Sequence, residues 1–332
     1  MLINPRSRSD PNAPRANIKS GITFRGRSIR FREEKLEIVV EIGTPEQKEL
    51  VSQEFRTVIE AAQSLDPPLN LTRIIVAADF EDTVNKIEGT TSYNSEKASD
   101  SSKVDVIAKI NKDGDGYAII LSLQLYSSLY DSQNRLCTIF HEFFHILNKR
   151  DFPPLPKDSY IKWLYFYNIY NYYDEYVADR KAYRLCEYLF PEKSQIWLDW
   201  MQIESIGYVE VINNPFYYNF IRKEIDLFRR HADLKKFEEQ THAYFDVVSI
   251  IICHAFALFH QYPEKINESD LHTSKFVNEK TFALMNFFKV KYESKSFDLS
   301  DGLDMIIDFM TNFGVKYEQR GEKEGYTYVL DI

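Results

Sequence analysis

Two spacings of apolar residues divide the chain into strand-like and helix-like parts. Short apolar runs rich in β-branched residues predict strands, and they cover 36–40, 72–78, 104–110 and 117–123. Apolar residues three and four positions apart predict helices over 44–62 and 132–148, and this spacing dominates from about residue 192 onward. The pattern therefore predicts an α+β fold, with a small mixed sheet followed by a mostly helical C-terminal region.

Capping and breaking residues set the expected helix limits. Thr44-Pro45-Glu46-Gln47 is typical of a helix start, because the threonine can cap the first turn and proline is tolerated there. Pro153-Pro154 closes the helix that begins near Ser132. Further breaks in the helical part are expected near 213–215, 262–263 and 314.

A polar turn separates the third and fourth predicted strands. Residues 111–116 read Asn-Lys-Asp-Gly-Asp-Gly, which resembles the start of a calcium-binding loop. The twelfth position of such a loop would be Ser122, where a bidentate glutamate is needed, and the flanking segments are strand-like. A β-hairpin is therefore the better interpretation.

The segment 138–147 contains His-Glu-x-x-His with helical apolar spacing. Residues four apart lie on one face of a helix, so His141 and His145 can point their imidazoles at one metal ion, and zinc is the metal typical of this pattern. Glu142 lies beside that face, where its carboxylate can take a proton from water activated by the metal. The alternative is a core helix with two hydrogen-bonded histidines.

A third ligand is expected from the helical stretch 174–182. Glu175 can supply a carboxylate oxygen to zinc, and Asp179, one turn later, can accept the outer N–H of a ligating histidine. A plain surface-charge role for this pair is the alternative. No donor for a tetrahedral oxyanion stands out; the candidates are His231, His242, His254, His260 and the many tyrosines, each of which can equally be structural.

The motifs His141-Glu142-x-x-His145 and Glu175-x-x-Ala178-Asp179 resemble those of the gluzincin metallopeptidases. With the apolar strand at 117–121 and the Leu-Phe-Pro ending at 189–191, residues 104–191 are similar to the ImmA/IrrE family of intracellular metallopeptidases. The resemblance implies Zn²⁺, a zincin-like core in which the sheet packs on the motif helix, and cleavage of a specific protein partner in stress or phage-related regulation. Phe143-Phe144 stands where that family usually has a small residue.

The strand before the motif helix is a candidate substrate-binding element. In metallopeptidases of this build, an edge strand can pair with an extended peptide substrate. Tyr117, Ile119 and Leu121 would then contact the substrate, whereas a strand inside the sheet would be unable to do so. Both placements are open at this point.

Two apolar stretches each allow a structural and a functional interpretation. The aromatic run 160–176 can line a substrate site, although a core or a partner interface is favoured. The stretch 243–259 is strongly apolar, but it is short for a membrane span and contains Asp246, Ser249 and His254, so a buried helix is expected and no membrane span.

Charge and cysteine content bound the remaining possibilities. The net charge of −9 disfavours stable nucleic-acid binding, although nine basic residues face four acidic ones up to Val40. Residues 1–32 read as a flexible basic arm, either a solvated tail or a tether for an acidic partner. Cys137, Cys186 and Cys253 are expected to be buried free thiols, and no secretory signal is recognisable, so a cytoplasmic location is expected.

The expected domain order is therefore a basic arm (1–32), a zincin-like metallopeptidase core (33–191) and a mostly helical region (192–332). The predicted function is that of a zinc-dependent endopeptidase acting on a protein or peptide substrate. A protein-interaction scaffold, zinc-stabilised or catalytically silent, is the alternative.

Overall fold

The computed structural model describes two compact units, each built from two stretches of chain. The first unit consists of Met1–Leu147 and Lys181–Glu204, and the second of Asn148–Arg180 and Ser205–Ile332. Within them the described residues are 3–5, 29–33, 36–41, 45–63, 71–90, 104–106, 108–127, 130–192, 194–231 and 234–317. The predicted division at residue 191 stays a prediction, because neither unit is one continuous stretch.

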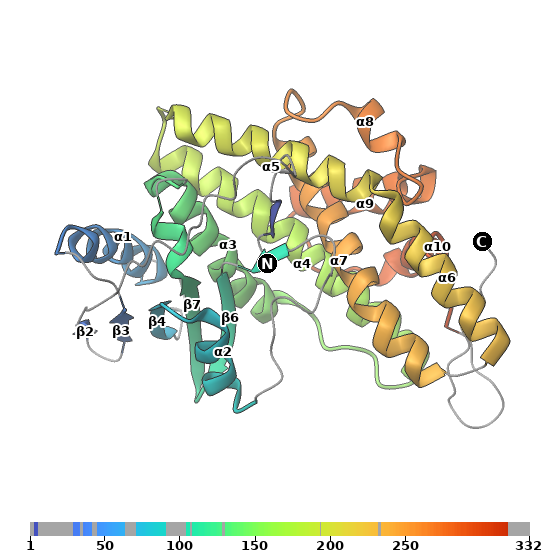
Figure 1. The fold of residues 1–332 in the computed structure, drawn as a ribbon, viewed down its shortest axis with the longest axis horizontal. Coiled ribbons are helices and arrows are strands. Elements are labelled where there is room, and N and C mark those ends of the chain that lie inside the picture. Colours follow the sequence, from blue (N-terminus) through green and yellow to red (C-terminus); the bar gives the residue numbers. More distant parts are fainter. Residues whose placement is uncertain are drawn as a thin grey trace, which may run out of the picture. The chain divides into compact units, whose positions relative to one another are not determined.

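A five-stranded mixed sheet lies in the first unit (Figure 1). Its strands are β2 (Ile29–Glu33), β3 (Leu36–Val40), β4 (Leu71–Ala77), β7 (Gly116–Ser122) and β6 (Ala108–Asp113), in that spatial order. The two central pairings, β3 with β4 and β4 with β7, are parallel, and the two outer pairings are antiparallel. The predicted α+β class and mixed sheet are therefore confirmed.

Of the two placements left open for 117–123, the one inside the sheet is observed, so this segment is wrong as the candidate edge strand. Strand β7 pairs with β4 on one side and with β6 on the other, so its backbone groups are used within the sheet. Because β7 is paired on both sides, no row of free backbone groups remains to which a peptide can add beside Tyr117. Ile119 and Leu121 are also fully buried. The edges of this sheet are β2 and β6.

The predicted hairpin is confirmed and is tighter than the polar run suggested. Strands β6 and β7 pair as far as Asp113 and Gly116, so only Gly114 and Asp115 form the turn. Gly114 has a φ of +58°, a conformation that glycine adopts without steric cost. A second, two-stranded pairing joins β1 (Ile3–Pro5) to β5 (Val104–Val106).

Two helices of the N-terminal half precede the motif helix. Helix α1 (Pro45–Gln63) begins at the predicted proline and buries Val51, Phe55 and Val58. Helix α2 (Phe80–Glu88) was not predicted, although Asp79 caps it and Gly89 ends it in the left-handed conformation. Its buried side chains, Phe80 and Val84, pack with Ile75, Ala77 and Ile120 of the sheet.

Two segments of the predicted basic arm are strands, namely β1 and β2, which corrects its description as flexible at these places. The rest of the arm, 1–2 and 6–28, lies outside the described residues. The three cysteines are free and buried, as predicted.

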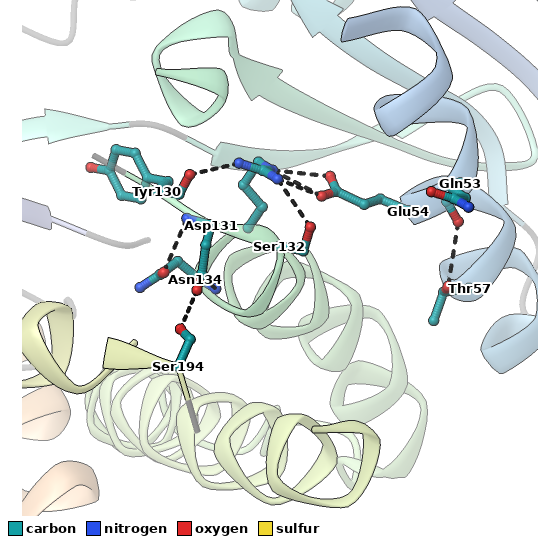
Figure 2. A network of polar contacts seen from close by, with 9 residues as sticks. Gln53, Glu54, Thr57, Tyr130, Asp131, Ser132, Asn134 and Ser194 are labelled. Carbon is teal, nitrogen blue, oxygen red and sulfur yellow. Dashed lines mark hydrogen bonds and ion pairs between the residues drawn. The ribbon is translucent and has the colours of Figure 1, made fainter. Parts of the chain in front are cut away.

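The motif helix α3 (Ser132–Asp151) forms as predicted and is anchored at its first turn. Asp131 and Asn134 exchange backbone-to-side-chain hydrogen bonds of 3.0 and 3.2 Å, a reciprocal cap that satisfies two N–H groups at the start of the helix. Figure 2 shows Glu54 of α1, Tyr130 and Ser132 converging on one guanidinium, that of Arg135. This network ties the start of α3 to α1 within the first unit.

Helix α4 (Tyr160–Leu189) carries the aromatic run and supports the core interpretation over most of its length. Tyr165, Tyr172, Tyr173 and Tyr176 are buried. Tyr160 and Tyr167 are exposed and stack on the two sides of Trp163, with ring centroids 5.5 and 5.3 Å apart.

The remaining described elements are helical, as the spacing from residue 192 predicts. They are the helices α5 (Gln195–Asn213), α6 (Pro215–His231), α7 (Leu234–Gln261), α8 (Glu268–His272), α9 (Glu279–Glu293) and α10 (Leu303–Thr311), with short 3-10 turns η2 (Leu123–Tyr126) and η3 (Ser300–Gly302). The breaks at 214, 262 and 314 confirm the predicted ones. In the second unit, α6 packs on α7, and α9 on α10.

One described helix, α7, is long and apolar enough to cross a membrane by length and composition alone. The window Tyr244–Gln261 meets that test, and 61% of it is buried inside the protein. Ser249 and His254 within the window are fully buried. Burial of these polar groups among protein atoms favours the predicted core helix.

Gly302 fills a position in the second unit where no side chain fits. A Cβ placed there would lie 2.6 Å from Ile169 Cδ1 and 2.7 Å from Phe287 Cε1. We expect Gly302→Ala to lower the free energy of unfolding by about 1–3 kcal/mol, because overpacking displaces well-packed side chains. Urea denaturation checks this: Gly302→Val should cost more than alanine, and an alanine variant as stable as the parent would contradict the prediction.

Candidate metal centre

Two histidines of α3 bring their outer ring nitrogens together inside the first unit. The Nε2 atoms of His141 and His145 lie 2.9 Å apart, and their rings are nearly perpendicular at 87°. Both side chains are buried. Zinc–nitrogen bonds of about 2.0–2.1 Å at the tetrahedral angle place two ligating nitrogens about 3.3–3.4 Å apart, so the two Nε2 atoms are slightly closer together than two bound ligands would be.

Glu142 follows His141 in the same helix and is 2% exposed. A carboxylate buried among apolar side chains is costly unless hydrogen bonds or a positive charge compensate it. Its burial next to a potential metal-binding pair is the arrangement expected for a proton acceptor rather than for a solvated surface charge.

The two phenylalanines between the histidines have separate packing roles. Phe143 is buried and meets Phe140 edge-to-face, with ring centroids 6.4 Å apart. Phe144 is half-buried and lies under the ammonium of Lys181 of α4, which is 5.6 Å from the ring centroid. The bulky pair therefore serves the packing around α3, one ring toward the core and one toward α4.

Of the predicted acidic pair of α4, Asp179 is hydrogen-bonded to a histidine of α7 inside the second unit, and Glu175 lies near the same ring. Asp179 Oδ2 accepts a hydrogen bond of 2.6 Å from His254 Nδ1, and both side chains are essentially inaccessible. The other ring nitrogen, Nε2, lies 3.8 Å from Glu175 Oε2. Glu175 is the more accessible carboxylate of the two, with a side chain 15% exposed.

The electrostatics of this group raise the pKa of His254. Burial alone would lower the pKa of His254, but the carboxylates of Asp179 and Glu175 outweigh it, so its pKa lies above the usual value. Tyr208 stacks on the imidazole with a centroid distance of 5.7 Å, which fixes the plane of the ring. His254 is thereby held in one orientation between two carboxylates.

Helices α3 and α4 each contribute residues to both units, and each unit contains a contact between them. Lys181 covers Phe144 in the first unit, and Asn148 Nδ2 donates to Asp174 Oδ1 at 2.8 Å in the second. The ligand atoms that His141, His145 and Glu175 can offer all lie within 4.8 Å of one another.

This donor set fits zinc chemically. Two imidazole nitrogens and one carboxylate oxygen are a combination that zinc accepts, with a fourth position left open for water or substrate. The Nε2 atoms of the two histidines would have to move slightly apart to bind one zinc ion, so small side-chain rotations would accompany metal binding.

His254 is the residue of this group whose role the sequence left open. Asp179 was predicted to accept a hydrogen bond from a histidine that binds the metal. In the structure Asp179 accepts a hydrogen bond from His254 instead. A hydrogen bond from a metal-binding histidine to Asp179 stays a prediction. The available signal was a polar histidine within the apolar run of α7. Of the other candidates for an oxyanion donor, His231 is exposed, His260 bonds Tyr176, and the side chain of His242 lies outside the described residues.

Comparison of the chain with protein-family models, with curated proteins and with solved structures finds no match. The candidate centre therefore rests on the residues and distances given above.

Proposed function

We propose that the chain is a zinc-dependent peptidase of the gluzincin type. The observation that carries the proposal is the convergence of His141, His145 and Glu175, together with the burial of Glu142, the residue that follows His141 in α3. The presence of the mixed sheet and of the part of α3 that carries both histidines in one unit supports a zincin-like core.

Each residue has a distinct part in the proposed reaction. His141, His145 and Glu175 would hold the zinc. Asp179 would fix the orientation of the His254 ring, whose other nitrogen lies near Glu175. Zinc, when bound, would acidify water and polarise the substrate carbonyl as a Lewis acid. Glu142 would accept the proton of the attacking water and later deliver it to the leaving amine.

The proposed substrate is a peptide bond in a specific protein partner. Strand addition at β7 is ruled out by its position inside the sheet, so an extended substrate that pairs with this sheet must use β2 or β6. We place the activity in the cytoplasm, where the three buried free thiols would stay reduced. Neither a membrane span nor a stable nucleic-acid complex is part of the proposal.

Metal removal tests the proposal directly. Purified protein should contain one zinc ion per chain, measured by mass spectrometry of the metal, and should cleave a protein in cells that express it, detected as new protein N-termini. Chelation should abolish cleavage in an extract, and added zinc should restore it. Protein that binds no zinc after reconstitution would refute the proposed centre, and zinc-loaded protein that cleaves nothing would favour the scaffold alternative.

A further inference from the structure

A buried guanidinium in the second unit lacks an anionic partner among the described residues. Arg180 of α4 is 4% exposed, and its described hydrogen bond runs from Nη1 to the hydroxyl of Tyr176, at 3.0 Å. Its Nε atom is buried and has no hydrogen-bond partner. An arginine stays charged at any physiological pH, so a buried one normally has a carboxylate or phosphate beside it.

The polar groups that surround Arg180 cannot neutralise it. Tyr176 receives the hydrogen bond from Arg180 and lies 2.8 Å from His260 Nδ1, so its own proton is directed to that nitrogen. Burial, and then the positive charges of Arg180 and Lys289, lower the pKa of His260 to about 3, so this imidazole is neutral. Tyr176 stays protonated as well, because burial raises its pKa.

The remaining contacts of the guanidinium are with aromatic rings. Its central carbon lies 4.7 Å from the ring centroid of Tyr292 and 5.8 Å from that of Tyr176. Such contacts attract a cation but leave its N–H groups without acceptors. Glu293 is the acidic residue whose charge helps to raise the pKa of Tyr176. It is exposed and makes no ion pair with Arg180 among the described residues.

One edge of the Arg180 guanidinium makes no hydrogen bond among the described residues. Nη1 is occupied by Tyr176, whereas Nε and Nη2 point their N–H groups in one direction and can grip two oxygens of one oxyanion. We propose that Arg180 is a binding site for an oxyanion, a carboxylate or phosphate group of a ligand, held on its Nε and Nη2 edge with Tyr176 fixing the opposite nitrogen. None of these side chains is a proposed metal ligand or the proposed base, so the inference is independent of the peptidase proposal.

Arginine side-chain NMR tests the site on the full-length protein. The ¹⁵N–¹H signal of Arg180 Nε, assigned through bonds, should shift saturably when sodium phosphate or sodium acetate replaces chloride at constant ionic strength. Saturation by acetate alone would identify a carboxylate site, and saturation by phosphate alone a phosphate site. If neither anion shifts the signal saturably, the proposal is wrong.

Two arginine variants separate this site from general charge effects. Arg180→Lys keeps the charge but loses the two-pronged edge, so the dissociation constant of the effective anion should rise at least about tenfold. Arg184→Lys, one turn later and exposed, should leave it unchanged. Equal binding by Arg180→Lys and the parent would overturn the proposal; if that variant does not fold, the Nε titration of the parent protein decides alone.

Discussion

Replacing Glu142 with glutamine should remove hydrolysis while leaving zinc in place. Glutamine has nearly the size of glutamate, but it cannot take a proton from water at neutral pH. A general base contributes about 10²–10⁴-fold to the rate, so kcat/KM should fall by about that factor. Zinc content should stay at one per chain, because Glu142 is not among the three residues with converging ligand atoms.

The matched control is Glu210→Gln, which makes the same chemical change at an exposed position of α5. It should alter neither zinc content nor cleavage. Full activity in Glu142→Gln with zinc bound would show that Glu142 is not the base. Loss of zinc together with activity would instead make Glu142 part of the metal-binding group.

The elements that the sequence predicts well are those whose pattern is local. The proline at the start of α1 and the His-Glu-x-x-His spacing of α3 each act within one or two helical turns, so the residues alone define them. Helix α2 escaped prediction because it is short. Its cap Asp79 and its terminal Gly89 enclose only nine residues.

The position of a strand within a sheet depends on partners far away in sequence. Tyr117–Leu123 has the apolar content of a strand either at an edge or in the interior, and only its pairing with both β4 and β6 decides between the two. The same limit applies to His254. It lies 75 residues after Asp179 in sequence, and only the packing of α7 brings its Nδ1 within 2.6 Å of that carboxylate.

Removing the carboxylate of Glu54 should destabilise the first unit more than any surface change. Arg135 donates to both oxygens of Glu54 at 2.7–3.1 Å, and the two side chains are 6% and 4% exposed (Figure 2). Glu54→Gln leaves the guanidinium buried with no countercharge, whereas the remaining acceptors, Tyr130 O and Ser132 Oγ, are neutral. Breaking a buried pair in this way costs about 3–5 kcal/mol.

This loss should propagate to the candidate metal centre, because Arg135 precedes His141 in α3 by less than two turns. Urea denaturation should show the fall in unfolding free energy, and zinc affinity should weaken in the same variant. Glu60→Gln, exposed on the same helix, should change stability by less than about 0.5 kcal/mol. The double variant Glu54→Met with Arg135→Met should lose less unfolding free energy than Glu54→Gln alone, because it leaves no unpaired charge. A double variant less stable than Glu54→Gln would show that packing, not charge pairing, dominates here.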